Sequence, residues 1–306
     1  TRARDIIAAG IGAKPEEIYF TAGGSESDNW ALKATAEAYA SKGNHIITSK
    51  IEHHAILHTC EWLENHGFEV TYIDVDENGV LKLDELKKAI RPTTILISVM
   101  FANNEIGTIQ PIKEIGEIAK EHGILFHTDA VQAYGHVPIN VDDLHIDMMS
   151  ASGHKINGPK GIGFLYIRTG VKIRSFIHGG AQERKRRAGT ENVPGVAGFG
   201  AAVKEMYTDH AEKIQKLIGL KDYMTDRLGE IEGTVINSKK GEASAPQIVS
   251  VSFEGVRSEV LLHALEDKGI YVSSGSACSS NHPGISGTLK GIGVAQKLLD
   301  STIRIS

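Results

Sequence analysis

Two short stretches of this chain decide its fold: Ile124-Leu125-Phe126-His127-Thr128-Asp129 and Ser152-Gly153-His154-Lys155. The first is typical of a buried strand that ends on a carboxylate, and the second of a polar turn that carries a lysine. A short apolar segment at 146–149 lies between them. If the two apolar segments are neighbouring parallel strands, Asp129, Gln132 and Lys155 meet at one edge of a sheet. An ordinary alternative stays open, in which Asp129 caps a helix and Lys155 is a surface residue.

The sequence around these stretches alternates between strand and helix patterns. Short apolar, β-rich runs predict strands at 18–21, 45–48, 69–73, 94–100, 124–128, 148–150 and 163–167. Apolar residues at helical spacing predict helices at 27–42, 54–66, 82–89 and 112–121. Strands separated by helices imply right-handed crossovers, so we expect an α/β fold with a mostly parallel sheet covered by helices on both faces.

The pattern changes after residue 203. A long charged helix is predicted over 204–231, followed by strands at 247–253, 270–272 and 303–306 and a helix at 258–268. These elements are typical of a smaller α+β domain. We therefore expect a large domain at residues 1–203 and a small C-terminal domain at 204–306.

Composition excludes several classes of function. The chain has 306 residues, of which 41% are hydrophobic, so it can bury a large core. A net charge of −5 gives no electrostatic reason to expect nucleic acid or a membrane as partner. Only two cysteines are present, so a disulfide framework is not expected and a reducing cytoplasm is the default location. Cys60 lies in the apolar pattern of a helix, which favours a buried, unreactive thiol.

A glycine-rich stretch, Thr21-Ala22-Gly23-Gly24-Ser25-Glu26-Ser27-Asp28-Asn29, follows the first strand and opens the first long helix. Glycines permit close approach of the backbone, and the amides at a helix start favour an anion, so Gly24 and Ser25 suit a phosphate. An ordinary turn with a serine cap is an equally good interpretation of this stretch alone.

Lys155 and Asp129 together favour one chemistry. A desolvated lysine can act as an amine nucleophile and a proton carrier. Pyridoxal phosphate needs such a lysine for its aldehyde and an acid that keeps its pyridine nitrogen protonated. The pair therefore favours a Schiff-base site, with the helix cap and the surface lysine as the open alternative.

Two further polar stretches follow predicted strands. Glu52-His53-His54 lacks a third ligand at a recognisable spacing, so no metal site is expected, and a structural histidine pair is the better interpretation. Asn103-Asn104-Glu105-Ile106-Gly107 suits hydrogen bonding to a ligand, but in isolation turn formation is favoured.

Cys278 differs from Cys60 in its surroundings. It lies among small polar residues, Ser276-Ala277-Cys278-Ser279-Ser280, where a thiolate would be accessible. Glycines at 284, 287, 291 and 293 predict a flexible segment downstream. An incidental exposed thiol remains a serious alternative when Cys278 is considered alone.

Taken in order, these motifs resemble the cysteine desulfurases of the NifS/IscS type, within the class V aminotransferase-like, fold-type I enzymes that use pyridoxal phosphate. The matching residues span the chain from Thr21-Ala22-Gly23-Gly24-Ser25-Glu26-Ser27 to Arg304. The motifs between these ends are, in order, Glu52-His53, Asn104-Glu105-Ile106-Gly107, Asp129-Ala130-Val131-Gln132, Ser152-Gly153-His154-Lys155, Gly189-Thr190-Glu191-Asn192 and Ser274-Gly275-Ser276-Ala277-Cys278. Each motif is weak alone, but six in the right order are highly specific.

The resemblance implies a role for each matching residue. Lys155 would hold the cofactor covalently and move the substrate Cα proton, Asp129 would pair with the pyridine nitrogen, and His53 would stack on the ring. Arg304 would grip the substrate carboxylate. The remaining cofactor contacts implied are Gln132 to the phenolic oxygen, Asn104 to cofactor or substrate, Gly24, Ser25, Ser152 and His154 to the phosphate, and Thr190 to the phosphate of the partner subunit in a homodimer.

The resemblance also implies the reaction. L-cysteine would become L-alanine, and Cys278 would take the sulfur as a persulfide on a long, mobile loop over 279–293. The acceptor would be an iron–sulfur scaffold or a tRNA thiolation enzyme, and the sequence does not choose between them. Selenocysteine lyase, another aminotransferase-like activity and a non-catalytic sulfur-transfer scaffold are the alternatives.

The chain departs from the family at both ends. A short Asn-Ala-Ala-Thr-Thr-like motif usually precedes the first helix, and a helical segment usually follows the position of Arg304. Neither occurs in this sequence. We therefore expect the chain to be part of a longer protein.

Overall fold

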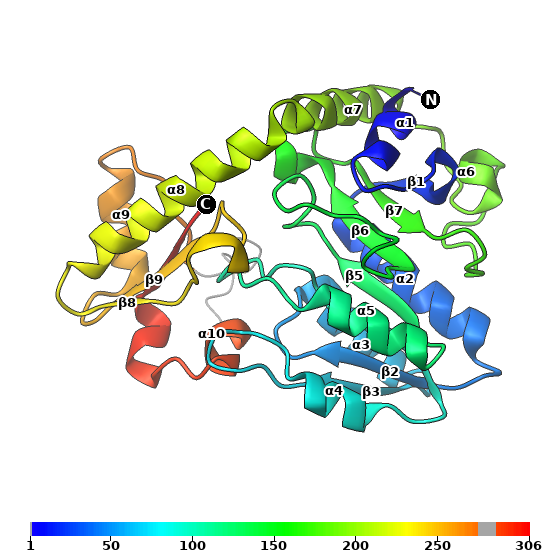
Figure 1. Ribbon diagram of the computed structural model, residues 1–306, viewed down its shortest axis with the longest axis horizontal. Helices are drawn as coiled ribbons and strands as arrows, with labels where there is room; N and C mark the ends of the chain where they lie inside the picture. Colours follow the sequence, from blue (N-terminus) through cyan, green and yellow to red (C-terminus); the bar gives the residue numbers. More distant parts are fainter. Residues whose placement is uncertain (1, 275–285) are drawn as a thin grey trace.

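The computed structural model describes residues 2–274 and 286–306, which form two sheets of unequal size (Figure 1). In the larger sheet, seven described strands follow the order β1-β7-β6-β5-β4-β2-β3. Their bounds are β1 (Ile18–Thr21), β2 (His45–Ser49), β3 (Glu69–Ile73), β4 (Thr94–Ser98), β5 (Leu125–Asp129), β6 (Met148–Ser152) and β7 (Gly163–Ile167). The strands from β6 to β3 are parallel, whereas β7 runs antiparallel to both of its neighbours, β6 and β1. The predicted mostly parallel sheet is confirmed.

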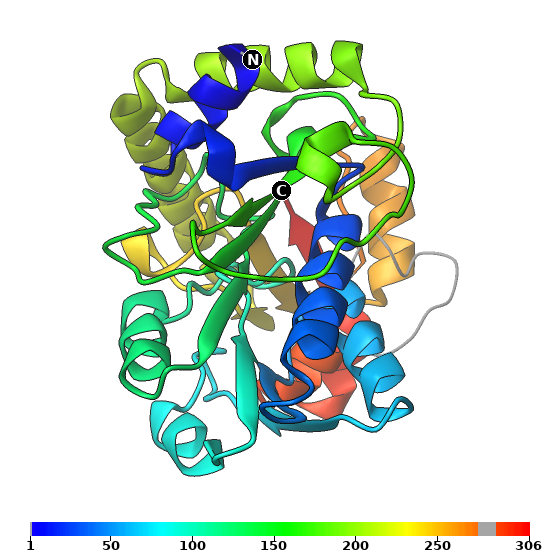
Figure 2. The ribbon, with the colours of Figure 1, turned by 90° about the vertical axis from the view of Figure 1, so that its right-hand side faces the viewer.

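Helices cover both faces of this sheet (Figure 2). Successive strand residues point to opposite faces, so Met148 joins one apolar cluster and Met149 the other. Helices α2 (Gly24–Tyr39) and α3 (His54–Glu64) cover the Met148 face. The Met149 face is covered by α1 (Arg2–Ala9), α4 (Leu83–Ala89), α5 (Ile112–Glu121) and α7 (Val193–Tyr207).

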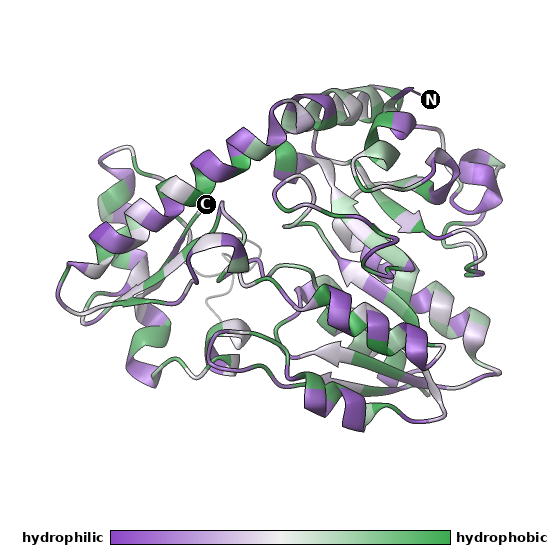
Figure 3. Cartoon of the chain, viewed as in Figure 1, coloured by the Kyte–Doolittle hydropathy of each residue, from purple (hydrophilic) through white to green (hydrophobic). Residues whose placement is uncertain are grey.

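The covering helices are amphipathic, as their spacing predicts. In α5, Ile112, Ile115 and Ile118 are buried against the sheet, while charged residues lie between them. Figure 3 shows the hydrophilic sides of α4 and α5 turned outward. Among the described residues, no helix combines the length and the apolar character that a bilayer crossing requires.

A smaller antiparallel sheet lies toward the C-terminus, in the order β10-β9-β8. Its strands are β8 (Thr234–Ile236), β9 (Val249–Phe253) and β10 (Thr302–Ile305), accompanied by α8 (His210–Gly229) and α9 (Ser258–Glu266). A two-sheet α/β architecture with a small α+β part is thus confirmed. The division at residue 203 stays a prediction, and α7 runs across that residue.

Three local predictions were wrong. The single helix expected over 204–231 is two helices, because the chain turns between α7 and α8, where Asp209 has φ 51°. The strand expected at 270–272 is absent from the described residues: Tyr271 is 77% exposed, and Ser273 alone forms a bridge, to Arg304. An exposed segment that has no neighbouring strand to pair with does not become a strand through its β-propensity alone.

The third correction concerns the segment downstream of Cys278. The flexible loop was expected to run to Gly293, but α10 (Gly287–Gly291) lies within it. A Cβ on Gly291 would approach Ile51 to 2.9 Å, so this glycine permits close packing of α10 on the larger part of the molecule. Leu289 and Ile292 join the same apolar cluster as Ile51. The remaining short helix, α6 (Gln182–Lys185), lies near β1 (Figure 1).

Candidate active site

The carboxyl ends of β5 and β6 lie side by side, because the two strands pair in parallel with Asp129 opposite Ser150. Polar residues predicted from sequence follow both strands, and they meet side chains from α2, α3, the loop after β4 and strand β10. Together they line one cavity of about 140 Å³. The predicted residues in this lining are Gly24, Ser25, His53, Asn104, Asp129, Gln132, Ser152, His154, Lys155 and Arg304.

Lys155 projects from a tight turn, the 3-10 helix at Gly153–Ile156. The Gly153 amide donates to the Ile162 carbonyl at 2.9 Å, and the Gly158 amide donates to the Gly153 carbonyl at 2.9 Å. Asn157, with φ 60°, ends the turn in the left-handed conformation that asparagine tolerates. The lysine is half-buried on a backbone that these bonds hold in place.

Asp129 is buried at the end of β5, with 5% of its surface exposed. Its Oδ1 accepts a hydrogen bond from the Val131 amide at 2.9 Å. Burial raises the pKa of Asp129, while His53, the Val131 amide and Lys155 oppose that rise. The carboxylate is therefore held among groups that favour its negative charge.

His53 and Glu52 follow β2 and play different parts. His53 is the N-cap of α3, where its Nδ1 accepts from the Ala55 amide at 3.1 Å, and its ring lines the cavity. Glu52 accepts from Ser49 Oγ at 2.6 Å and from the Met100 amide at 2.9 Å, which ties the loop to the end of β4. Burial raises the pKa of Glu52 to about 8. No group of three possible metal ligands occurs in the described ranges, 2–274 and 286–306.

The start of α2 forms a glycine cradle beside Ser152. Gly23 has φ 150°, and a Cβ on Gly24 would lie 2.6 Å from Val131 Cγ2. A Cβ on Gly163 would lie 2.7 Å from the Gly23 Cα, so this glycine allows β7 to pass close to the cradle. The amides of Ala22 and Gly23 donate to Glu26 Oε2 at 3.0 Å and Thr21 Oγ1 at 3.3 Å, and the N-cap residue Gly23 supplies no side-chain cap for the amides that follow. Uncapped amides at the start of a 16-residue helix suit an anion.

Arg304 reaches the cavity from the smaller sheet. It is 9% exposed, and its Nη1 donates to the Asn104 carbonyl at 3.0 Å. Asn103 instead makes the turn, since its Oδ1 accepts from the amides of Glu105 and Ile106 at 2.8 and 3.0 Å. Asn103 thus forms the turn that the sequence favoured, whereas Asn104 lines the cavity.

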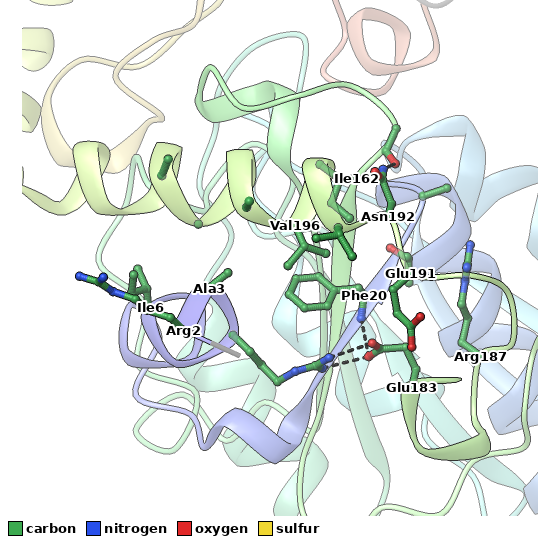
Figure 4. Close-up of a pocket in the computed structure, with 18 of the residues that line it drawn as sticks. Arg2, Ala3, Ile6, Phe20, Ile162, Glu183, Arg187, Glu191, Asn192 and Val196 are labelled. Atoms are coloured by element: carbon green, nitrogen blue, oxygen red, sulfur yellow. Dashed lines mark hydrogen bonds and ion pairs between the residues drawn. The ribbon is translucent and has the colours of Figure 1, made fainter. Parts of the chain in front are cut away.

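Two predicted residues remain to be placed. Cys278 lies outside the described residues. Thr190 lines a separate groove of about 770 Å³ between α1, α7 and β1. Figure 4 shows Phe20, Ile162 and Val196 facing this groove, which also carries Arg187 and Glu183. Ion pairs at its edge join Arg4 to Glu183 at 2.8 Å and Arg187 to Glu26 at 2.7 Å.

One acidic residue of the cavity was missed. Asp28 lines the cavity beside Asp129 and is 1% exposed. The sequence held a clue, because Asp28 shares one buried side of α2 with Ala31, Leu32 and Thr35, where apolar residues prevail. A carboxylate on the buried side of a helix is a candidate functional group. It was overlooked because the polar residues at this glycine-rich start were interpreted as helix caps.

Comparison with known proteins identifies the family. Residues 1–306 match the aminotransferase class V family. The chain belongs to this family.

Its relatives carry a more specific name. The cysteine desulfurase IscS of Methanosarcina thermophila is 56% identical over 304 residues, which cover 99% of this chain and 75% of the relative. The cysteine desulfurase IscS of Clostridium botulinum, strain Hall, is 50% identical over 306 residues, or 99% of this chain and 77% of the relative.

Solved structures of a NifS-like protein and of a cysteine desulfurase have the same fold. A NifS-like protein superposes with a TM-score of 0.92 at 40% identity, over 100% of this chain and 80% of that structure. An apo cysteine desulfurase from Thermococcus onnurineus NA1 gives a TM-score of 0.88 at 30% identity, over 99% of this chain and 77% of that structure. The resemblance inferred from the motifs is confirmed.

Proposed function

We propose that this protein is a pyridoxal-phosphate-dependent cysteine desulfurase, which converts L-cysteine to L-alanine and transfers the sulfur to Cys278. The observation that carries the proposal is the cavity in which Lys155, Asp129, His53 and Arg304 converge. A lysine, a buried carboxylate, an imidazole and a guanidinium suit amino-acid chemistry on a bound aldehyde. The names of the relatives support the same activity.

The residues of the cavity fit pyridoxal phosphate. The cradle at Gly23 and Gly24 is closed to larger side chains and presents uncapped amides, with Ser25 and Ser152 beside it, so a phosphate suits it. Asp129 would face the pyridine nitrogen, Gln132 the phenolic oxygen and His53 the ring. When bound, the cofactor supplies an electron sink that makes the Cα–H of an attached amino acid acidic.

The chain's own residues would handle the substrate. Lys155 would hold the cofactor's aldehyde carbon and then carry the proton removed from Cα. Arg304 would bind the substrate carboxylate, because its guanidinium presents a fork of donors that matches a carboxylate. The bond from Arg304 to the Asn104 carbonyl orients that fork within the cavity.

Cys278 would accept the sulfur. Its thiolate attacks the sulfur of the substrate, an S–S bond forms, and the C–S bond breaks with its electron pair moving to carbon. That carbon gains a proton and leaves as alanine, while Cys278 keeps one sulfane sulfur as a persulfide. The step requires no external oxidant, because the substrate carbon gains the electrons that the sulfur atoms lose.

A second copy of the chain and a sulfur acceptor complete the proposal. The groove beside α7 is apolar and carries Thr190, so it suits a homodimer in which Thr190 reaches the partner's phosphate. An iron–sulfur scaffold or a tRNA thiolation enzyme would receive the sulfur, and neither nucleic acid nor a membrane is expected as a partner. A cytoplasmic location suits a mechanism that needs a reduced thiol.

A comparison of the two cysteines tests the function. The variant Cys278→Ser should lose sulfide release and protein-bound persulfide with L-cysteine, yet keep the visible absorbance of the bound cofactor. Cys60→Ser is the matched control, since Cys60 is fully buried in α3 and burial raises the pKa of its thiol. Turnover that survives in Cys278→Ser would favour another aminotransferase-like activity, and a wild-type protein without turnover would favour a scaffold.

A further inference from the structure

Asp28 lines the cavity and has no role in the chemistry described so far. It projects from the buried side of α2, one turn after Gly24, and it lines the same cavity as Asp129. The side chains of Asp28 and Asp129 are within hydrogen-bonding contact. Two carboxyl groups can form such a bond only if one of them holds a proton.

The polar groups around Asp28 leave it poorly supported as an anion. His127 Nε2 lies 3.8 Å from Asp28 Oδ1, too far for a hydrogen bond, and is already bonded to Ser150 Oγ at 3.0 Å. His127 Nδ1 is bonded to Ser98 Oγ at 2.8 Å. Burial lowers the pKa of His127 to about 3, so this histidine is neutral and offers no counter-charge. Within the described part of the chain, no donor reaches Asp28 Oδ1.

The two carboxyl groups differ in what faces them. Asp129 has the Val131 amide, with His53 and Lys155 nearby. Asp28 faces Asp129 and Glu52, while Ser150 opposes their effect through a hydrogen bond. Burial raises the pKa of Asp28 well above its usual range, and the charge of Asp129 adds to this rise. The shared proton therefore belongs on Asp28.

We propose that Asp28 is a positioning residue that donates a hydrogen bond from its neutral carboxyl group to Asp129. This bond would fix the rotamer of Asp129 and keep that carboxylate charged at the place where the cofactor's pyridine nitrogen binds. The inference rests on the proposed function and deepens it. Asp28 would act on the cofactor through Asp129.

Carbon-13 NMR of the stripped, full chain with labelled aspartate carboxyl groups tests the protonation directly. The signal that disappears in Asp28→Asn is expected to remain that of a neutral acid through neutral pH. If that signal shows an ionised group titrating at an ordinary aspartate pKa, the proposal is overturned. This readout needs neither cofactor nor turnover.

The affinity of the stripped protein for pyridoxal phosphate tests the positioning role. Asp28→Leu should weaken binding roughly 10–100-fold, because a hydrogen bond to a charged group is lost. Asp28→Asn should restore most of the affinity, since an amide can still donate to Asp129. Thr35→Val removes a buried hydroxyl from the same helix without touching the cavity, and its affinity should match the wild type.

The outcomes separate this inference from the proposed function. If Asp28→Asn and Asp28→Leu weaken the binding of pyridoxal phosphate equally, Asp28 acts only through packing and the inference is overturned. A wild-type protein that fails to bind pyridoxal phosphate would contradict the proposed function instead. Thermal unfolding of each variant shows whether it is folded. If Asp28→Leu does not fold, the NMR measurement on the wild-type chain still tests the inference.

Discussion

The lysine cavity and the groove beside α7 differ in size and in chemistry. The cavity, about 140 Å³, is lined by a lysine, an arginine, histidines and buried carboxyl groups from several elements of one chain. The groove, about 770 Å³, has walls such as Phe20, Ile162 and Val196, and two ion pairs lie at its edge. Desolvated, converging charges serve chemistry on a small ligand, whereas a wide apolar groove suits a protein surface.

The largest expected effect comes from the lysine itself. Lys155→Ala should lower the rate of alanine formation by about 10²–10⁴-fold or more, because both the covalent anchor and the proton carrier are lost. The visible absorbance of the lysine-bound cofactor should also disappear. The exposed neighbour Lys160 supplies the control, since Lys160→Ala should retain both properties. If Lys155→Ala forms alanine at the wild-type rate, the cavity takes no part in the mechanism.

A smaller effect is expected where the cavity binds the substrate. Arg304→Lys should raise the KM for L-cysteine roughly 10–100-fold with a lesser change in kcat, because lysine cannot present the two parallel donors of a guanidinium. Arg257→Lys, at an exposed position of the C-terminal part, is the control. A fall in kcat at constant KM would assign Arg304 to the chemical step instead of carboxylate binding.

The groove is tested by a charge at its edge. Val193 is 66% exposed at the first turn of α7, where an aspartate costs the isolated chain little. In a dimer that buries the groove, Val193→Asp should weaken self-association at least about tenfold. Sedimentation measures the effect, and Val260→Asp on α9, where the valine is 61% exposed, is the matched control. If Val193→Asp self-associates as strongly as the wild type, the dimer interface does not include this groove.

The smallest effect on turnover is expected from Glu52→Gln, because Glu52 ties the loop to β4 and does not line the cavity. Its stability should nevertheless depend on pH. The pKa of Glu52 is about 8 in the folded chain against 4.5 in the unfolded chain, so the unfolded state releases its proton first. Wild-type stability should fall as pH rises from about 4.5 to 8, relative to the variant. Urea unfolding at several pH values measures the free energy of unfolding of both proteins. A difference between them that does not change with pH would contradict the raised pKa of Glu52.

The sequence predicted those features that depend on local pattern and on order along the chain. Alternating strand and helix periods gave the sheet and its helical covers, and Asp129 and Lys155 lie at one edge because their strands are parallel neighbours. The break at Asp209 was missed, since a left-handed aspartate leaves no trace in hydrophobic spacing. Asp28 was missed for a related reason: its burial and its contact with Asp129 arise only when α2 packs on the sheet.

The hairpin from β6 to β7 constrains how this protein can change in length. Gly163 pairs with Ser152 on one side and with Thr21 on the other, so the lysine turn and the glycine cradle share one register. A single residue inserted between Lys155 and Gly163 would shift β7 by one position and turn its alternate side chains to the wrong face. Insertions in the crossovers of α4 or α5 would leave that register intact. Length variation among homologues should therefore gather on the α4 and α5 side and spare these few residues.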